Sequence, residues 1–413
     1  MRIAKALWKG FVAVAASAIL SSTLLAQSQQ RSAAEYGPGT EVTLAAPLET
    51  PSARNRSQVV GWPAGRKPTA PPGFQVDVYA DKLEAPRWTY VLPNGDVLVA
   101  LSLDGRIVLL RDSNKDGRLE TRTDFLAGQS RPFGTLLLGG YLYVGNTNAV
   151  VRFRYQTGQT ELSGTGEKIL DLPGGGHWTR NLTANANGSK IYVSVGSRSN
   201  VDEDGSDAKD PRRAAILEIN PDGSGMRVFA SGLRNPVGMA WEPVTTMLWT
   251  AVNERDGLGD RLVPDYITSV RDGAFYGWPY SYYGKNEDPR KKGQRPDLVA
   301  KAIVPDYAVG AHTASLGLAF YTGSQYPEKY RGGAFIGQHG SWNRSQFAGY
   351  KVAFLPFRDG KPAGTLEDFL TGFIASASEV YGRPVGVSMM PDGSLLVADD
   401  EGGKLWRVHY VGR

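Results

Sequence analysis

The sequence predicts an all-β protein, a six-bladed β-propeller whose blades are four-stranded antiparallel sheets. Patterns with the period of a helix are scarce, and short Val-, Leu- and Tyr-rich segments alternate with turns rich in the 50 Gly and 25 Pro of the chain. A cycle of turn and strands also returns six times, starting at positions 86, 132, 180, 236, 315 and 384. These spacings fit a repeat of roughly 40–50 residues with extra loops. Because one blade cannot bury its own faces, the six should form a single domain.

Each cycle opens with a short polar or Pro-containing segment and continues into an apolar strand. The opening segments are residues 85–88, 131–134, 179–182, 235–238, 314–317 and 383–386. The strands that follow them are expected at residues 97–99, 141–144, 191–193, 247–250, 333–337 and 394–398. The order of opening, turn and strand is the same each time, which favours a repeated sheet over unrelated strands.

The N-terminus has the pattern of a signal peptide at residues 1–26. Arg2, Lys5 and Lys9 precede a mostly apolar run, and Ala26 offers a small residue for cleavage. Residues 27–72 are rich in Ser, Ala, Gly and Pro and are expected to form a linker and an N-terminal strap, with the propeller at 73–413. We expect a periplasmic or secreted protein without a membrane span once the leader is removed. An uncleaved leader stays open as the alternative.

Composition excludes several classes of function. The chain has no cysteine, so disulfides, thiolate metal sites and cysteine nucleophiles are excluded. The net charge of +5 includes three positive residues of the leader, and the remaining +2 is too small to indicate a nucleic-acid partner.

The strongest candidate for catalysis is His177, one of four histidines. It follows three glycines at positions 174–176 and precedes Trp178, Arg180 and a strand at residues 191–195. A glycine-rich loop that leads into a sheet is a common place for a catalytic base. A structural histidine at a strand end is the alternative.

Polar residues gather where the cycles open, which in a propeller is where loops converge at one end of the central axis. They are Gln129, Arg131, His177, Arg180, Arg234, Asn235, His312, His339, Trp342, Asn343, Arg344 and Arg383. Since unpaired buried charges are costly, several arginines at equivalent points predict an anionic ligand. Salt bridges between blades are the alternative for any single arginine.

Two loops have ligands that suit calcium. Residues 253–260 form an acidic, Gly-containing loop directly after a strand, and residues 112–120 alternate oxygen-bearing side chains with a glycine. The second lacks the closing glutamate of an EF-hand, since Thr123 stands there, so a hairpin turn with or without calcium is expected. A plain surface loop is an equal alternative for the first.

These motifs together resemble the soluble PQQ-dependent sugar dehydrogenases. The resemblance covers roughly residues 74–410 and rests on the ordered set at 175–182, 192–196, 234–238, 276–279, 382–387 and 391–393. The segments 253–256 and 339–344 are most similar to the branch called sorbosone dehydrogenases. The resemblance implies oxidation of a sugar or sugar-derived aldehyde with PQQ and Ca²⁺ as cofactors. A periplasmic quinone or cytochrome would accept the electrons.

The resemblance also implies roles for individual residues. His177 is expected to be the general base, and Gln129 matches a glutamine beside it. Arg234 and Asn235 would contact the quinone oxygens of PQQ, and Arg383 would bind the cofactor. Trp178, Trp342, Asn343 and Arg344 are further candidates for the cofactor site. Calcium is expected on backbone carbonyls within Glu254, Arg255 and Asp256, although a Gly-Pro pair of the glucose-oxidising members is missing there. Val385 stands where those members have a second arginine.

Two other functions remain as alternatives. A calcium-dependent lactonase-type hydrolase would need several carboxylates and an asparagine around one metal at the channel mouth, whereas the cycle starts supply mainly arginines and histidines. A non-catalytic propeller that binds carbohydrate or protein would leave His177 on its triple-glycine loop without a role.

Overall fold

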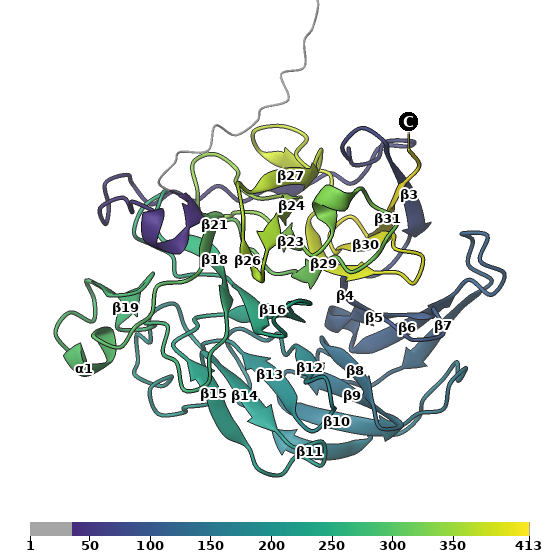
Figure 1. The fold of residues 1–413 in the computed structure, drawn as a ribbon, viewed down its shortest axis with the longest axis horizontal. Coiled ribbons are helices and arrows are strands. Elements are labelled where there is room, and N and C mark those ends of the chain that lie inside the picture. Colours follow the sequence, from purple (N-terminus) through teal and green to yellow (C-terminus); the bar gives the residue numbers. More distant parts are fainter. Residues whose placement is uncertain (1–34, 413) are drawn as a thin grey trace, which may run out of the picture. The chain divides into compact units, whose positions relative to one another are not determined.

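The computed structural model describes residues 35–412, which form six sheets arranged around a common axis (Figure 1). Each blade is a four-stranded antiparallel sheet, and the predicted six-bladed propeller is thereby confirmed. The predicted signal peptide, residues 1–26, lies outside the described residues. No helix of the described part of the chain is long and apolar enough to cross a membrane.

In blades one to five, the four blade strands follow one another in chain order from the central axis outward (Figure 1). Blade one contains β4 (Pro86–Val91), β5 (Val97–Leu101), β6 (Arg106–Arg111) and β7 (Thr121–Leu126). Blade two contains β8 (Thr135–Leu138), β9 (Tyr141–Asn146), β10 (Ala149–Arg154) and β11 (Glu167–Asp171). Blade three contains β12 (Leu182–Ala184), β13 (Ile191–Val195), β14 (Ala215–Ile219) and β15 (Arg227–Ser231).

The remaining blades repeat this order with two variations. Blade four contains β16 (Pro236–Trp241), β17 (Leu248–Val252), β18 (Pro264–Ser269) and β21 (Tyr307–Ala311), to which β1 (Tyr36–Pro38) adds a fifth strand. Blade five contains β22 (Ala319–Phe320), β23 (Ala334–Gln338), β24 (Lys351–Leu355) and β27 (Glu367–Leu370). Blade six contains β29 (Pro384–Met389), β30 (Leu395–Asp399), β31 (Lys404–Tyr410) and β3 (Phe74–Ala80).

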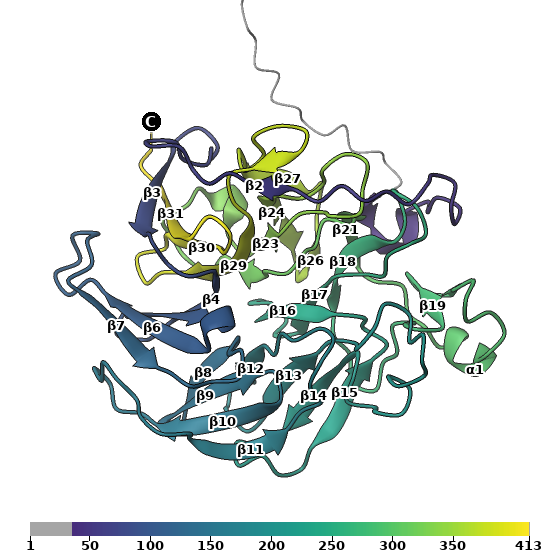
Figure 2. The same ribbon diagram turned by 180° about the vertical axis from the view of Figure 1, so that it is seen from behind.

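The last blade closes the ring with strands from both ends of the sequence. In β3 and β31, Phe74 pairs with Tyr410 and Val78 with Trp406, and the two strands lie side by side in both views (Figures 1 and 2). Because β3 leads directly into β4, this pairing joins the first blade to the last.

The long intervals in the repeat contain inserted elements. Residues 270–306 extend from blade four with β19 (Ser281–Tyr282), β20 (Asn286–Glu287) and the one-turn helix α1 (Pro296–Val299). The interval in blade five holds the hairpin of β25 (Phe357–Arg358) and β26 (Lys361–Pro362).

The segment before the propeller lies against it over much of its described length. Its strand β2 (Gln58–Val59) pairs in parallel with β28 (Glu379–Val380). The indole of Trp62 donates to Asp399 at 2.7 Å. Buried Glu35 forms ion pairs with Arg261 and Arg344. Short 3₁₀ turns occur at Gly39–Glu41, Ser102–Asp104 and Glu328–Tyr330.

Packing between blades explains why the middle strands are buried along their whole length. All five residues of β5 are buried, as are those of β13, β17, β23 and β30. A strand with neighbouring blades on both faces has no solvated side, so it lacks the alternation of a half-exposed strand. At the centre, apolar side chains from separate blades pack into one cluster, formed by Trp88, Ala100, Phe133, Val237, Leu316 and Val385 with Trp178 against it. Val237, Leu316 and Trp178 of this cluster also line the cavity described next.

Candidate active site

Blade starts and the loops between second and third strands converge on a cavity of about 320 Å³ at one end of the axis. Its size lies at the lower end of small-molecule sites, which are roughly 300–1,000 Å³. Its polar lining consists of the guanidinium groups of Arg87, Arg234 and Arg383, the imidazoles of His177, His312 and His339, the amides of Asn235, Asn253 and Asn343, and the carboxylate of Asp256. Trp178 and Trp342 also line it.

The loop that carries His177 is held by two buried arginines. Arg180 donates to the carbonyl of His177 at 2.7 Å, and Arg213 donates to the carbonyls of Gly174 and Gly175. Gly176 has a φ of 66°, and a Cβ there would lie 2.3 Å from the backbone of Arg198, so the turn requires glycine. Arg180 therefore supports the loop and does not line the cavity, contrary to its interpretation as part of an anion site.

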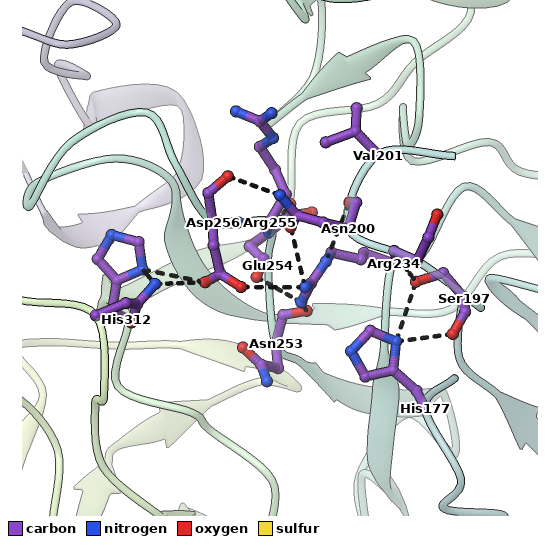
Figure 3. Close-up of polar contacts among 12 residues, drawn as sticks. His177, Ser197, Asn200, Val201, Arg234, Asn253, Glu254, Arg255, Asp256 and His312 are labelled. Carbon is purple, nitrogen blue, oxygen red and sulfur yellow. Dashed lines mark hydrogen bonds and ion pairs between the residues drawn. The ribbon is translucent and has the colours of Figure 1, made fainter. Parts of the chain in front are cut away.

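The hydrogen bonds of His177 define its tautomer. Its Nδ1 lies 2.8 Å from the carbonyl oxygen of Ser197 and 3.0 Å from the hydroxyl oxygen of the same residue (Figure 3). Since a carbonyl only accepts, Nδ1 carries the proton. The neutral ring then has its lone pair on Nε2. Burial, and after it the positive charge of Arg234, lower the pKa of His177 to about 3. The ring is thus a neutral acceptor on the cavity wall.

Arg234 is paired entirely with the protein itself. Its guanidinium donates to the carbonyls of Asn253 (3.2 Å) and Glu254 (2.7 Å), and to the carbonyl and side-chain oxygens of Asn200 (3.4 and 3.1 Å). It also contacts a carboxylate oxygen of Asp256 at 3.3 Å. Five acceptors occupy the five N–H groups of an arginine. Figure 3 shows Arg234 at the centre of this group.

The loop at residues 253–256 differs from the predicted set of backbone calcium ligands. The carbonyl of Glu254 accepts from Arg234, and that of Asp256 accepts from Asn200 at 2.9 Å. The side chain of Arg255 is buried beside Asp288 and lies outside the cavity wall. Within this loop, the cavity-lining residues are Asn253 and Asp256. The oxygen atoms of this loop that could bind a hard cation such as Ca²⁺ at the cavity therefore belong to side chains.

Buried Glu254 accepts from the backbone N–H of Arg255 at 2.8 Å. Burial raises the pKa of Glu254 to about 7. It is therefore a carboxyl that ionises near neutral pH beneath the cavity rather than a charged ligand within it.

Asp256 connects Arg234 with the blade-five side of the cavity. Asn343 donates to its carboxylate at 2.6 Å, and Nδ1 of His312 lies 3.5 Å away. Burial would raise the pKa of Asp256, but Arg234 and these contacts outweigh it and lower that pKa to about 2. The second nitrogen of His312 donates to the carbonyl of Gly259 at 2.8 Å. Asp256 in turn raises the pKa of His312 against the effect of burial.

A second group of charges lines the opposite blades. Arg383 donates to Glu401 and to the carbonyls of His339 and Gly340. Nε2 of His339 lies 2.9 and 3.0 Å from the two carboxylate oxygens of Asp400, which also contact Arg87. Burial, followed by the charge of Arg383, lowers the pKa of His339 to about 3.

Sequence reasoning named His312 and His339 as polar starts but did not assign them to the site, and it missed Arg87 and Asp400. The position of Arg87 in the opening segment of the first cycle was the available signal.

Two predicted site residues lie elsewhere. The guanidinium of Arg344 donates to both carboxylate oxygens of Glu35 in the strap, at 2.7 and 3.3 Å, and Arg344 is not part of the cavity wall. Gln129 accepts from Asn146 at 2.9 Å and is not part of the cavity wall. The structure does bring His177, Trp178, Arg234, Asn235, Trp342, Asn343 and Arg383 together, as the converging loops predicted.

In the loop at 112–120 the carboxylates of Asp112, Asp116 and Glu120 approach one another within 4.8 Å. They accept backbone N–H groups of the same turn, including that of Gly117 at 2.8 Å and that of Ser113 at 2.6 Å. These bonds close the hairpin turn.

Fold and cavity define a six-bladed propeller with an imidazole- and guanidinium-lined small-molecule cavity. The sequence matches the family described as TrAA12-like over residues 68–266 and 289–411, which is most of the chain. The protein belongs to the TrAA12-like family.

Known proteins of similar sequence include an aldose sugar dehydrogenase, YliI, of Escherichia coli, 32% identical over 27% of this chain and 28% of its own length. An uncharacterized protein of Borreliella burgdorferi is 36% identical over 57% of this chain, and the match spans 61% of that protein.

Among solved structures, a Trichoderma reesei carbohydrate-active enzyme of family AA12 has a TM-score of 0.72 at 20% identity, covering 86% of this chain and all of its own. The holo PQQ domain of a pyranose dehydrogenase from Coprinopsis cinerea has a TM-score of 0.70 at 21% identity, covering 85% and 99%. The resemblance to soluble PQQ-dependent sugar dehydrogenases is confirmed, whereas the sorbosone branch stays a prediction.

Proposed function

We propose that the protein oxidises a sugar or sugar-derived aldehyde with PQQ, and that His177 is the general base. The observation that carries this proposal is the neutral ring of His177, whose Nδ1–H is held by Ser197 and whose Nε2 is left as an acceptor on the cavity wall. Family membership and the names of the relatives support the reaction class.

The cavity residues fit an anionic planar cofactor. PQQ carries three carboxylates, and guanidinium groups from separate blades face the cavity. Trp178 supplies an aromatic surface beside His177. Arg383 and Asn235, which line the cavity, would hold the cofactor through guanidinium and amide N–H groups that donate to its oxygens. When bound, PQQ supplies a quinone that accepts a hydride.

His177 moves the proton in this scheme. The hydroxyl proton of the sugar goes to Nε2 while the adjacent C–H bond gives up a hydride and the C–O bond becomes a carbonyl. The carbonyl and hydroxyl oxygens of Ser197 stabilise the positive charge that forms on the ring. Because burial disfavours that charge, the protonated ring passes its proton on readily.

We further propose that calcium binds beside this cavity, with Asp256 and Asn253 as oxygen donors. Carboxylate and amide oxygens suit Ca²⁺, and both residues line the cavity. The ion would act there as a Lewis acid toward the quinone. Dialysis against EDTA, followed by calcium titration of purified protein, tests this assignment. Retention of full activity without calcium would refute it.

The deciding experiment adds PQQ and Ca²⁺ to purified protein and follows dye reduction with aldoses and sorbosone. Reduction that depends on both PQQ and sugar is expected. Lactone hydrolysis without any dye reduction would instead favour the hydrolase. A sugar that binds without either reaction would favour a non-catalytic propeller. We expect export to the periplasm or medium and a quinone or cytochrome as the electron acceptor, both of which require tests in cells.

A further inference from the structure

The three arginines of the cavity differ in how many of their donors the protein already uses. Each has a carboxylate partner: Arg234 contacts Asp256, Arg383 contacts Glu401, and Arg87 contacts Asp400. Charge alone therefore does not separate them. What a carboxylate ligand requires is free N–H groups in the planar fork, because a guanidinium binds it through two parallel hydrogen bonds.

Arg234 has no donor left, since its five N–H groups meet five protein oxygens. Arg383 uses three of its N–H groups, one from each nitrogen, to donate to two carbonyls and to Glu401. Arg87 uses one, from Nη1 to Asp400. Of these three groups, Arg87 keeps the most donors for a ligand.

The contact between Arg87 and His339 does not reduce this number. Nη1 of Arg87 lies 3.2 Å from Nε2 of His339. That nitrogen lies 2.9 and 3.0 Å from the carboxylate oxygens of Asp400, which only accept, so it carries its own proton. Arg87 and His339 thus both donate to Asp400, and buried Asp400 fixes the guanidinium in place.

The surroundings of Arg87 point the same way. Its guanidinium lies 5.5 Å from the ring centre of Trp178, the residue that follows His177. Val385, at the corresponding place in blade six, is fully buried in the apolar cluster beneath the cavity and offers no charge. The backbones of the two blades nearly touch here, because a Cβ on Gly386 would lie 3.1 Å from the carbonyl of Arg87.

We propose that Arg87 is the main residue that binds a carboxylate of the cofactor. Asp400 would hold the guanidinium in position and balance its charge before the cofactor enters. This inference rests on the proposed function, because it takes PQQ as the anion.

Equilibrium dialysis of PQQ in the absence of sugar tests the proposal through binding alone. For Arg87→Gln we expect the Kd for PQQ to rise about 10- to 100-fold, the usual worth of a hydrogen bond to a charged group. Arg131→Gln is the matched control, since Arg131 lies at a similar distance, 5.9 Å, from the Trp178 ring but is exposed and outside the cavity wall. Its Kd should stay within about twofold.

Arg87→Lys covers the case in which the glutamine variant fails to fold, because lysine keeps a positive charge for Asp400. A point charge cannot reproduce the planar fork, so its Kd should still rise several-fold. An unchanged Kd in a folded Arg87 variant, with tight binding by the wild type, would overturn the inference alone. Failure of the wild-type protein to bind PQQ at millimolar concentration would overturn the proposed function.

Discussion

Replacing His177 by alanine separates a catalytic role from a structural one. The side chain loses its hydrogen bond to Ser197, but the carbonyl of Ser197 still accepts from the backbone N–H of residue 177 at 3.0 Å. The ring also borders a cavity, so its removal enlarges an existing space. We therefore expect a stability loss of only about 1 kcal/mol, a decrease in Tm of less than roughly 5 °C. Turnover should fall about 10²- to 10⁴-fold, the usual contribution of a general base.

The assay is PQQ-dependent dye reduction at saturating cofactor, with the Kd for PQQ measured by dialysis on the same samples. Added imidazole should restore part of the activity of His177→Ala by occupying the vacated space. His409→Ala is the control, since His409 lies on β31 and outside the cavity wall. Turnover within threefold of wild type, or a loss explained wholly by weaker PQQ binding, would show that His177 is not the base.

Three further predictions concern buried charges. Arg234→Ala should destabilise the protein by about 3 kcal/mol, because Asp256 loses its arginine partner and two carbonyls lose their donor. Arg383→Ala should cost less, since its partner Glu401 is exposed. Equal urea midpoints would refute this order. In Glu254→Gln, stability relative to wild type should rise with pH between about 4.5 and 7, by up to about 3 kcal/mol. As pH rises, Glu254 ionises earlier in the unfolded state than in the folded state, so the wild type loses stability over this range. Glutamine does not ionise, so the variant keeps its stability there. Parallel stability–pH curves would contradict the assignment. Glu35→Ala should lower Tm and increase proteolysis before residue 72, because Arg261 and Arg344 each lose an ion pair with the strap. Unchanged cleavage there would show that the strap is held by its other contacts.

Sequence alone was sufficient for the architecture because the repeat encodes it. The starts expected at 86, 236 and 384 coincide with the first residues of β4, β16 and β29, and the others precede their strands by two to four residues. These offsets of two to four residues occur next to the cavity. There, polar residues at the opening of the cycle come before the first residue that pairs in the strand. Position in a cycle is thus well determined by hydrophobic pattern and turns.

The direction of a side chain was not determined by its position in a cycle. Arg180 and Arg234 occupy similar places before β12 and β16, yet Arg180 bonds to carbonyls beneath its own loop while Arg234 reaches across to Asp256. Arg344 follows two cavity residues in sequence but turns to Glu35, more than 300 residues away. Such choices depend on which acceptors the fold brings near, and those acceptors come from distant segments.

The pairing of every cavity arginine changes how an anion site should be recognised. An arginine without a partner would be costly in this cavity, so the presence of an acidic neighbour is expected whether or not a ligand binds. The charges of Arg87, Arg234 and Arg383 balance those of Asp400, Asp256 and Glu401. Attraction by net charge is therefore small, and selectivity for a tricarboxylate has to come from the fixed geometry of unused N–H groups. Ranked by unused N–H groups, Arg87 is the best candidate to bind the cofactor, Arg383 is second and Arg234 is last. For Arg234 this is the reverse of the cofactor-binding role that the resemblance to known dehydrogenases implied.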